Sequence, residues 1–347
     1  MKSSVFVAKY LEKKGVTHVF ELIGGMITHL IDSINSKSNI EIISCHHEQC
    51  AGFAAEGMAR ITGIPGIALA TSGPGATNLL TAIGSCYFDS VPVLFITGQV
   101  NTYELKNQRK IRQLGFQETD IVSMAKPLCK YAVQVKESQY LPSVLKKAFE
   151  IALEGRQGPC LVDLPMNIQS DQIQDELVNI FINEEMAKDK NKIKLDKYLK
   201  NDIDLDQKIG FLRDDIRNAK KPLILAGGGC STFKNRDCSR KIIKQLNLPV
   251  ILSLLGVDIL SSDNNQRVGF IGSYGNRWAN KILGESDLLI TIGSRLDIKQ
   301  TGSDLESFCG EKKIWQIDID DNEVGARFKP YNHIITSLSY FQKKLNA

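Results

Sequence analysis

Short apolar runs alternate with helical patterns along the first 170 residues. Val5, Ala8 and Leu11 mark one face of a helix that stops at Gly15. The strand-like runs are residues 16–20, 41–45, 66–71, 92–97, 131–135 and 160–164, and helical patterns cover about 49–62, 76–87 and 140–153. Apolar strands that alternate with helices are typical of a parallel sheet covered on both faces.

A second alternating set follows a stretch of different composition. Residues 171–207 are rich in Asp, Glu and Lys and poor in aromatics, which indicates an exposed, partly helical linker. Further strand-like runs cover residues 222–226, 249–253, 287–292 and 313–317. The pattern predicts the α/β class with two doubly wound parallel-sheet domains, at residues 1–170 and 208–347.

Composition adds few constraints. The 347 residues suit two ordinary domains. A net charge of +4 is too small to indicate a nucleic-acid or membrane-surface partner, and we expect neither. The 8 cysteines form no CxxC pair, so we expect buried thiols in a reducing compartment rather than a zinc site. No apolar stretch reaches the roughly 18 residues of a membrane helix. We therefore expect a cytoplasmic protein.

A glutamate lies where the strand-like run 41–45 gives way to a helix. Glu48 is followed by Ala51, Ala55 and Ala59 at helical spacing, so the helix would pack on the sheet. A carboxylate at the carboxyl end of a parallel strand faces the crevice where such sheets bind ligands. The alternative is a charge that only favours the helix N-terminus.

A glycine-proline loop follows the next predicted strand. The loop reads Thr71-Ser72-Gly73-Pro74-Gly75-Ala76-Thr77-Asn78 and opens another helix. Glycines beside a proline let the backbone approach a flat ligand closely, whereas a plain turn capped by Ser72 or Thr77 is the alternative.

Together these segments resemble the pyrimidine-binding domain of the acetolactate-synthase branch of thiamine-diphosphate enzymes. The resemblance also runs through Ala54-Ala55-Glu56-Gly57, Asp89-Ser90-Val91-Pro92, Thr97-Gly98-Gln99-Val100, Phe116-Gln117-Glu118 and Gly158-Pro159-Cys160-Leu161-Val162-Asp163-Leu164-Pro165. It covers nearly all of residues 1–170.

The resemblance implies roles for particular residues. The matching glutamate, Glu48, is the catalytic residue that hydrogen-bonds N1′ of the cofactor's aminopyrimidine. Gly25, Pro74 and Asn78 match positions around the cofactor, whereas Phe116 and Gln117 match positions on the substrate side. The implied reaction is carboligation or decarboxylation of a 2-oxo acid, with the cofactor as electron sink.

Two departures from the family pattern bear on the substrate. Acetolactate synthases carry an early Tyr-Pro-Gly-Gly-Ala loop, where this chain has Leu22-Ile23-Gly24-Gly25-Met26. They also carry a lysine in the motif that ends the first domain, where this chain reads Leu164-Pro165-Met166-Asn167. These changes leave open a relative that acts on another 2-oxo acid or on an activated sugar.

A glycine run follows the first strand of the second set. Gly227-Gly228-Gly229 forms a tight turn or a phosphate loop, but the third glycine of a dinucleotide fingerprint is missing. The segment resembles the family's central domain, which holds FAD in acetolactate synthases and another nucleotide or nothing in other members. By that resemblance Arg295 lies near the flavin's polar chain and Asp318 accepts from a ribose or adenine group. A surface ion pair and a solvated strand end are the alternatives.

The family's third domain binds the cofactor's diphosphate through Mg²⁺ with a Gly-Asp-Gly motif, which this sequence does not contain. We therefore expect no metal site in this chain, which would be inactive alone and would need a diphosphate-binding domain, present elsewhere or lost. The resemblance also implies a homodimer or higher oligomer. The alternative is a non-catalytic nucleotide-binding or dimerising remnant.

Overall fold

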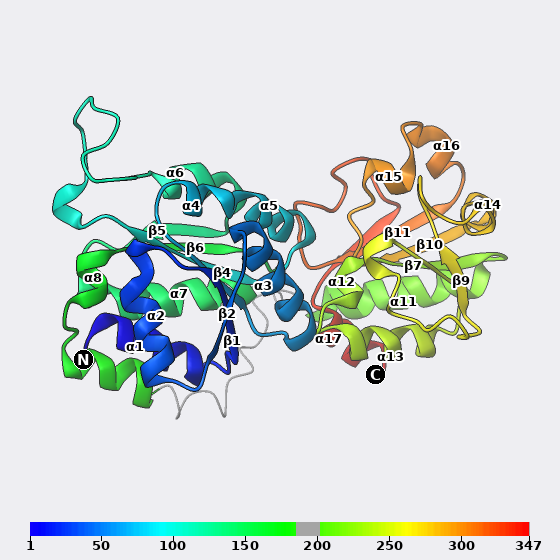
Figure 1. Ribbon diagram of the computed structural model, residues 1–347. Helices are drawn as coiled ribbons and strands as arrows, with labels where there is room; N and C mark the ends of the chain where they lie inside the picture. The colour runs from blue at the N-terminus through cyan, green and yellow to red at the C-terminus, as the bar shows by residue number, and fades with distance from the viewer. Residues whose placement is uncertain (185–201, 347) are drawn as a thin grey trace. The chain divides into compact units, whose positions relative to one another are not determined.

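The computed structural model describes residues 1–184 and 202–346, which fold as two compact units (Figure 1). Each unit contains one six-stranded sheet, and all the strand pairs in both sheets are parallel. The predicted fold class, with two doubly wound parallel-sheet domains, is confirmed.

The first unit is built around the strand order β2-β1-β3-β4-β6-β5. These strands are β1 (His18–Leu22), β2 (Glu41–Ser44), β3 (Gly66–Ala70), β4 (Val93–Gln99), β5 (Tyr131–Gln134) and β6 (Cys160–Pro165). The central strands β3, β4 and β6 are buried along their whole length, because helices cover both faces.

Two apolar layers enclose this sheet. The helices of one layer are α1 (Ser3–Lys13), α2 (Thr28–Lys37), α7 (Leu141–Leu153) and α8 (Met166–Ser170), and they share a core that contains Phe6, Leu30 and Phe149. The other layer contains α3 (Glu48–Thr62), α4 (Pro74–Asn78), α5 (Leu80–Asp89) and α6 (Ile121–Ala125). Figure 1 shows the two layers on opposite sides of the sheet.

The second unit has the order β12-β11-β10-β7-β8-β9. Its strands are β7 (Pro222–Ala226), β8 (Val250–Leu252), β9 (Arg267–Phe270), β10 (Leu288–Ile292), β11 (Lys313–Asp318) and β12 (Asn332–Ile335). The helices α11 (Asp202–Asn218), α13 (Arg236–Leu246) and α17 (Leu338–Leu345) pack on one face. The other face is covered by α14 (Arg277–Glu285) and α16 (Leu305–Cys309). Both ends of this sheet differ from the sequence prediction, because β9 and β12 were not predicted.

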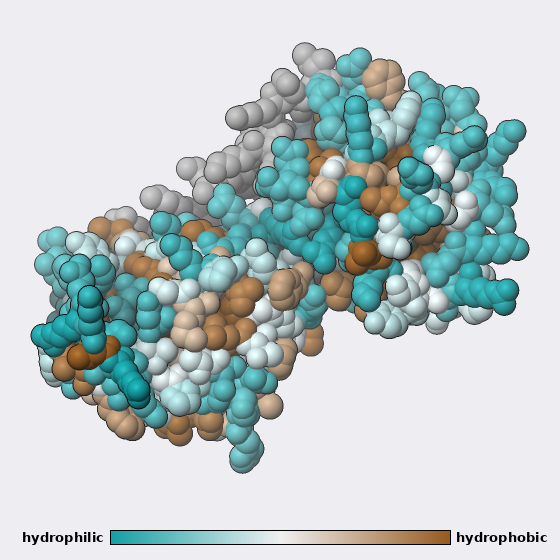
Figure 2. All heavy atoms as spheres, turned by 90° about the horizontal axis from the view of Figure 1, so that it is seen from above, coloured by the Kyte–Doolittle hydropathy of each residue, from teal (hydrophilic) through white to brown (hydrophobic). Residues whose placement is uncertain are grey.

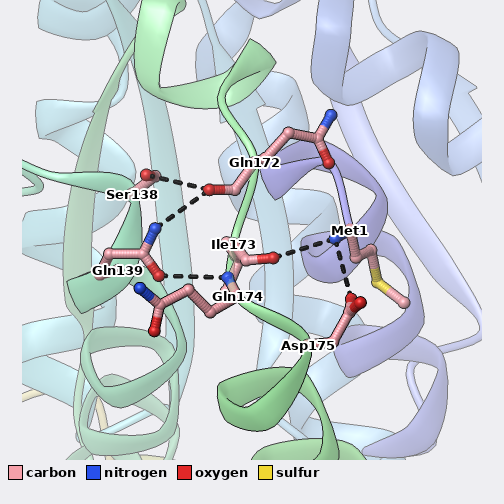
Figure 3. A network of polar contacts seen from close by, with 7 residues as sticks. All are labelled: Met1, Ser138, Gln139, Gln172, Ile173, Gln174 and Asp175. Atoms are coloured by element: carbon pink, nitrogen blue, oxygen red, sulfur yellow. Dashed lines mark hydrogen bonds and ion pairs between the residues drawn. The ribbon is translucent and has the colours of Figure 1, made fainter.

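Residues 171–184 pack against the first unit, although they belong to the predicted linker 171–207. Ile173 and Val178 are buried in its core. Figure 3 shows the polar contacts of this segment: the Met1 amino group donates to the Ile173 carbonyl at 2.9 Å, and Gln174 N donates to Gln139 Oε1 at 3.2 Å. Residues 185–201 of that linker lie outside the described residues.

The molecular surface is largely polar, with separate apolar patches on the face seen in Figure 2. Within the part of the chain that the structure describes, no helix combines the length and apolar character needed to cross a membrane.

Candidate functional site

The candidate site lies at the carboxyl edge of the first sheet, where the strand order reverses. From β1 the chain passes to β2 on one side and then returns to β3 on the other side of β1. In open α/β sheets this reversal leaves a crevice beyond the strand ends, and ligands bind there. The turns after β1 and β3 carry Gly24-Gly25 and Gly73-Pro74, so the topology brings two of the predicted segments to one edge.

Glu48 opens α3 at this edge. His47 caps the helix by accepting a hydrogen bond from Gln49 N at 3.1 Å, and the alanine face of the helix packs on the sheet. The Glu48 side chain is buried, with only 6% of the residue exposed. Asn78 Nδ2 donates to Glu48 Oε2 at 2.8 Å. Among the described residues no donor reaches Glu48 Oε1, so this carboxylate oxygen can accept from a ligand.

The turn after β3 lies against this carboxylate. Gly73 has φ of 64°, in the left-handed region that favours glycine, and Pro74 follows at the start of α4. A Cβ at Gly75 would lie 2.8 Å from Thr71 Cγ2 and 3.2 Å from Glu48 Oε1. Glycine at this position therefore keeps the space beside the carboxylate open.

The turn after β1 fits against the same loop. A Cβ at Gly24 would lie 2.4 Å from Thr71 Cβ, and Met26 N donates to Thr71 Oγ1 at 3.2 Å. Gly25, by contrast, has no atom within 4 Å of the position of a Cβ. The predicted cofactor residue Gly25 thus occupies the open side of a turn whose other glycine is tightly packed.

The two predicted substrate residues occupy different surroundings. A Cβ at Gly73 would lie 2.7 Å from Gln117 Cβ, so Gln117 packs on the turn that leads to Pro74. Its φ of 60° also departs from ordinary side-chain-bearing backbone. Phe116 is 73% exposed and makes no ring contact within the described residues. The structure therefore brings Glu48, Pro74, Asn78 and Gln117 to one edge and leaves Phe116 at the surface.

Two buried carboxylates in this sheet received no role from the sequence reasoning. Glu21 is 1% exposed in β1 and accepts from Ser44 Oγ, while its second oxygen has no partner in the described part of the chain. Asp163 is equally buried in β6 and accepts three side-chain hydrogen bonds. The available signal was an acidic residue inside an otherwise apolar strand, since such a residue is rarely buried without a partner.

The second unit has a comparable reversal between β7 and β10. Gly227 N donates to the Ile292 carbonyl at 2.8 Å, and Gly229 N donates to the Gly293 carbonyl at 3.0 Å. Both amides are therefore already used by the neighbouring turn. A phosphate at this loop would have to be bound by Gly228 or by side chains.

Arg295 follows β10, and Asp318 is the last residue of the neighbouring strand β11. The Arg295 side chain is 48% exposed, and its Nε lies 3.7 Å from Asp297 Oδ2, a long contact for an ion pair. Asp318 Oδ1 accepts from Ile319 N at 2.7 Å and from Asp320 N at 3.0 Å. Both side chains thus lie at the carboxyl edge of the second sheet, and their nucleotide-binding roles stay predictions.

No group of three or more His, Cys, Asp or Glu side chains arranged to hold a metal ion occurs among the described residues.

Residues 1–124 match the family described as thiamine pyrophosphate enzyme, N-terminal TPP binding domain. Residues 211–345 match the central domain of the same enzymes.

Several curated relatives are named acetolactate synthases. The chain is 35% identical to acetolactate synthase 1, chloroplastic, of Nicotiana tabacum over 346 residues, which are 100% of this chain and 49% of the relative. It is 36% identical to the acetolactate synthase large subunit of Haemophilus influenzae, covering 93% of this chain and 54% of the relative. Isozyme 3 of Escherichia coli is 32% identical, with 93% and 54% covered.

The chain spans about half the length of these curated relatives. The two domain matches, together with the relatives' names, confirm the resemblance that the motifs indicated. The chain therefore belongs to the thiamine pyrophosphate enzymes, of which it carries the N-terminal TPP binding domain and the central domain.

Proposed function

We propose that the first unit binds the aminopyrimidine end of thiamine diphosphate and that Glu48 is the catalytic residue. The observation that carries this proposal is the buried Glu48 carboxylate, with one oxygen bonded by Asn78 and the other without a donor in the described part of the chain. A carboxylate so placed can share a proton with a ring nitrogen of the ligand. When bound, thiamine diphosphate supplies the electron sink for chemistry next to the carbonyl of a 2-oxo acid.

The remaining side chains at this edge orient and shield the reacting groups. Asn78 orients the Glu48 carboxylate, and the turn at Gly73-Pro74 offers backbone that a flat ring can approach. Gln117 packs on that turn, and in our proposal it contacts the substrate. Burial of most of the Glu48 side chain limits the directions from which a ligand can reach its free oxygen.

We propose that the full reaction is an acetolactate-synthase-like carboligation or decarboxylation of 2-oxo acids. The names of the relatives support this reaction, and they are about twice as long as this chain. In our proposal, residues outside these 347 bind the diphosphate through Mg²⁺, and the working form is a cytoplasmic homodimer or higher oligomer. Light scattering would give twice 38.6 kDa for a dimer of this chain, and the mass of one chain would contradict it.

The proposed cofactor contact is tested by titrating thiamine diphosphate into the chain in a calorimeter. Glu48→Gln should weaken binding by roughly 10- to 150-fold, because a hydrogen bond to an ionised partner contributes about 1.5–3 kcal/mol. Glu41→Gln is the matched control, since Glu41 is an exposed glutamate on the neighbouring strand β2. Equal affinity of the wild type and Glu48→Gln would contradict the proposal.

For the second unit we propose FAD as the nucleotide, contacted by Gly228, Arg295 and Asp318. The support is the central-domain match and the position of these residues at the reversal of the sheet. A flavin absorbance band in the purified chain, or after FAD is added and the excess removed, is the expected result. A protein without that band would contradict FAD binding by this unit.

A further inference from the structure

Asp163 receives three hydrogen bonds inside the first sheet. Thr97 Oγ1 donates to Oδ1 at 2.7 Å, while Gln134 Nε2 and Gln99 Nε2 donate to Oδ2 at 2.9 and 3.1 Å. The donors come from β4 and β5, the two strands that flank β6. Burial raises the pKa of Asp163 to about 6, although the three hydrogen bonds oppose the shift. Burying a carboxylate costs folding free energy unless it is hydrogen-bonded. The partners of Asp163 therefore indicate which part of the structure it stabilises.

Gln99 connects this carboxylate to a segment outside the sheet. Its Nε2 donates both to Asp163 Oδ2 and, at 2.7 Å, to the carbonyl of Thr119, while its Oε1 accepts from Val100 N at 3.1 Å. A carboxylate can only accept, so Asp163 determines that the NH₂ end of the Gln99 amide faces Thr119. With the amide reversed, two oxygens would face each other at Thr119.

Thr119 lies at the base of the segment that carries both predicted substrate residues. Thr119 Oγ1 donates to the carbonyl of Gln117 at 3.2 Å, and Gln117 packs on Gly73. Within the segment, the Glu118 carboxylate accepts from Lys106 N at 2.7 Å and from Leu114 N at 2.8 Å. These bonds make residues 106–118 a closed loop, which Figure 1 shows projecting from the first unit.

The other end of this segment is attached to α8, the helix after β6. Asn167 Oδ1 accepts from Thr102 N at 2.9 Å, and Asn167 Nδ2 donates to Thr102 Oγ1 at 3.0 Å. Asn167 follows shortly after Asp163 at the start of α8. Both ends of residues 101–120 are therefore fixed by polar side chains from the end of β4 and the β6–α8 region.

We propose that Asp163 is a positioning residue, which acts through Gln99 to hold residues 101–120 so that Gln117 stays against the Gly73 turn. The link from Asp163 through Gln99 to Thr119 is seen in the hydrogen bonds of this chain. Only its consequence for substrate binding rests on the proposed function, through the role given there to Gln117. The two can therefore fail separately.

The test is hydrogen exchange by mass spectrometry on the 347-residue chain, read in peptides covering residues 113–122. Gln99→Met removes the donor to Thr119, and Asp163→Leu removes both carboxylate oxygens, including the acceptor that orients the Gln99 amide. Both variants should exchange about tenfold faster in these peptides, which corresponds to the loss of about one hydrogen bond. Exchange at the wild-type rate in both variants would overturn the proposal.

Gln134→Met is the matched control. The Gln134 side chain donates to the same carboxylate, and among the described residues this is its one hydrogen bond. The control should lower the stability of the unit while leaving exchange in residues 113–122 within about twofold of the wild type. Equal acceleration in Gln134→Met and Gln99→Met would mean that the sheet is simply weakened, and would overturn the positioning role.

A charge-swapped double variant separates positioning from packing. Asp163→Asn combined with Gln99→Glu keeps an amide and a carboxylate between β6 and β4, but at pH 8 the carboxylate at 99 cannot donate to Thr119. Residues 113–122 should therefore still exchange fast. Recovery of the wild-type rate would overturn the proposal. Thiamine diphosphate titration of the wild type judges the proposed function independently of this result.

Discussion

The two units share a six-stranded parallel sheet, and they differ in the residues that lie where the strand order reverses. In the first unit the edge carries a buried carboxylate, Glu48, held by a side-chain amide, and one of the glycines faces open space. In the second unit the glycine turn is closed on its neighbour, because Gly227 and Gly229 donate their amides to the β10 turn. The same sheet topology therefore provides an accessible buried carboxylate, the candidate reactive site, in one unit and a backbone-packed turn in the other.

The largest expected effect concerns Glu48. In an assembly completed with the diphosphate-binding part of a relative, Glu48→Gln should lower thiamine-diphosphate-dependent turnover by about 10²–10⁴-fold, because it removes a proton-transfer group. Release of CO₂ from pyruvate is the measurement, and Glu41→Gln should stay near the wild-type rate. Near-normal turnover of Glu48→Gln would contradict the catalytic role of Glu48, and with it the proposed difference between the two units.

The pH dependence of stability should also differ between the units. The pKa of Asp163 rises from 3.8 to about 6 through burial, with a smaller contribution from the charge of Asp120. Between these values the folded unit binds a proton that the unfolded chain does not. The free energy of unfolding should therefore fall as pH rises from about 4 to about 6, by up to about 3 kcal/mol.

Asp163→Asn should remove this part of the slope, measured by denaturant unfolding followed with far-UV circular dichroism. Tryptophan fluorescence serves as the internal control, because Trp278 and Trp315 both belong to the second unit and the chain has 2 tryptophans in all. The fluorescence transition should show the same pH dependence in the wild type and the variant. An unchanged circular-dichroism slope in Asp163→Asn would assign the titration to another group.

The smallest predicted effects concern stability changes at the glycine turns. Each unit offers a tightly packed glycine and a more open neighbour that serves as its matched control. A Cβ at Gly227 would lie 2.1 Å from the Gly293 carbonyl oxygen, whereas at Gly228 it would lie 3.0 Å from the side-chain atom Leu255 Cβ. Gly227→Ala should therefore lower the unfolding free energy of the second unit by about 1–3 kcal/mol, and Gly228→Ala by less than about 1 kcal/mol. The tryptophan unfolding midpoint measures both.

The first unit offers the same contrast between Gly24, which packs on Thr71, and the open Gly25. Gly24→Ala should destabilise by about 1–3 kcal/mol, while Gly25→Ala should leave stability within about 0.5 kcal/mol and act only on ligand binding. Circular dichroism and thiamine diphosphate titration measure the two effects. A Gly25→Ala protein that is destabilised but binds normally would remove Gly25 from the candidate site.

Most strands could be predicted from the sequence, and the exceptions have a physical reason. The central strands are covered on both faces and therefore appear as continuous apolar runs, as in β3 and β10. The missed strands β9 and β12 lie at the two edges of the second sheet and are only partly buried. An edge strand needs no continuous apolar run, so its pattern does not stand out from a loop.

The sequence patterns missed the helix α2 and misplaced the ends of two helical regions that they did predict. The pattern from 76 to 87 predicts one helix, whereas the structure has α4 and α5, which meet at Leu79. The predicted start at 140 corresponds to a short 3₁₀ turn, Ser138–Tyr140, before α7. Local hydrogen bonding at helix ends decides such boundaries, and it leaves little trace in the apolar pattern.

By itself the sequence determined the fold class and the family, because buried parallel strands and glycine-proline turns have recognisable local patterns. It also predicted Glu48 as the catalytic residue. Only the tertiary structure decided which polar groups meet. Asn78 and Glu48 are 30 positions apart, and Gln99 and Asp163 are 64 apart. Parallel sheets bring the ends of sequence-distant strands together, so the partners of a buried carboxylate follow from strand order and register, which no local pattern records.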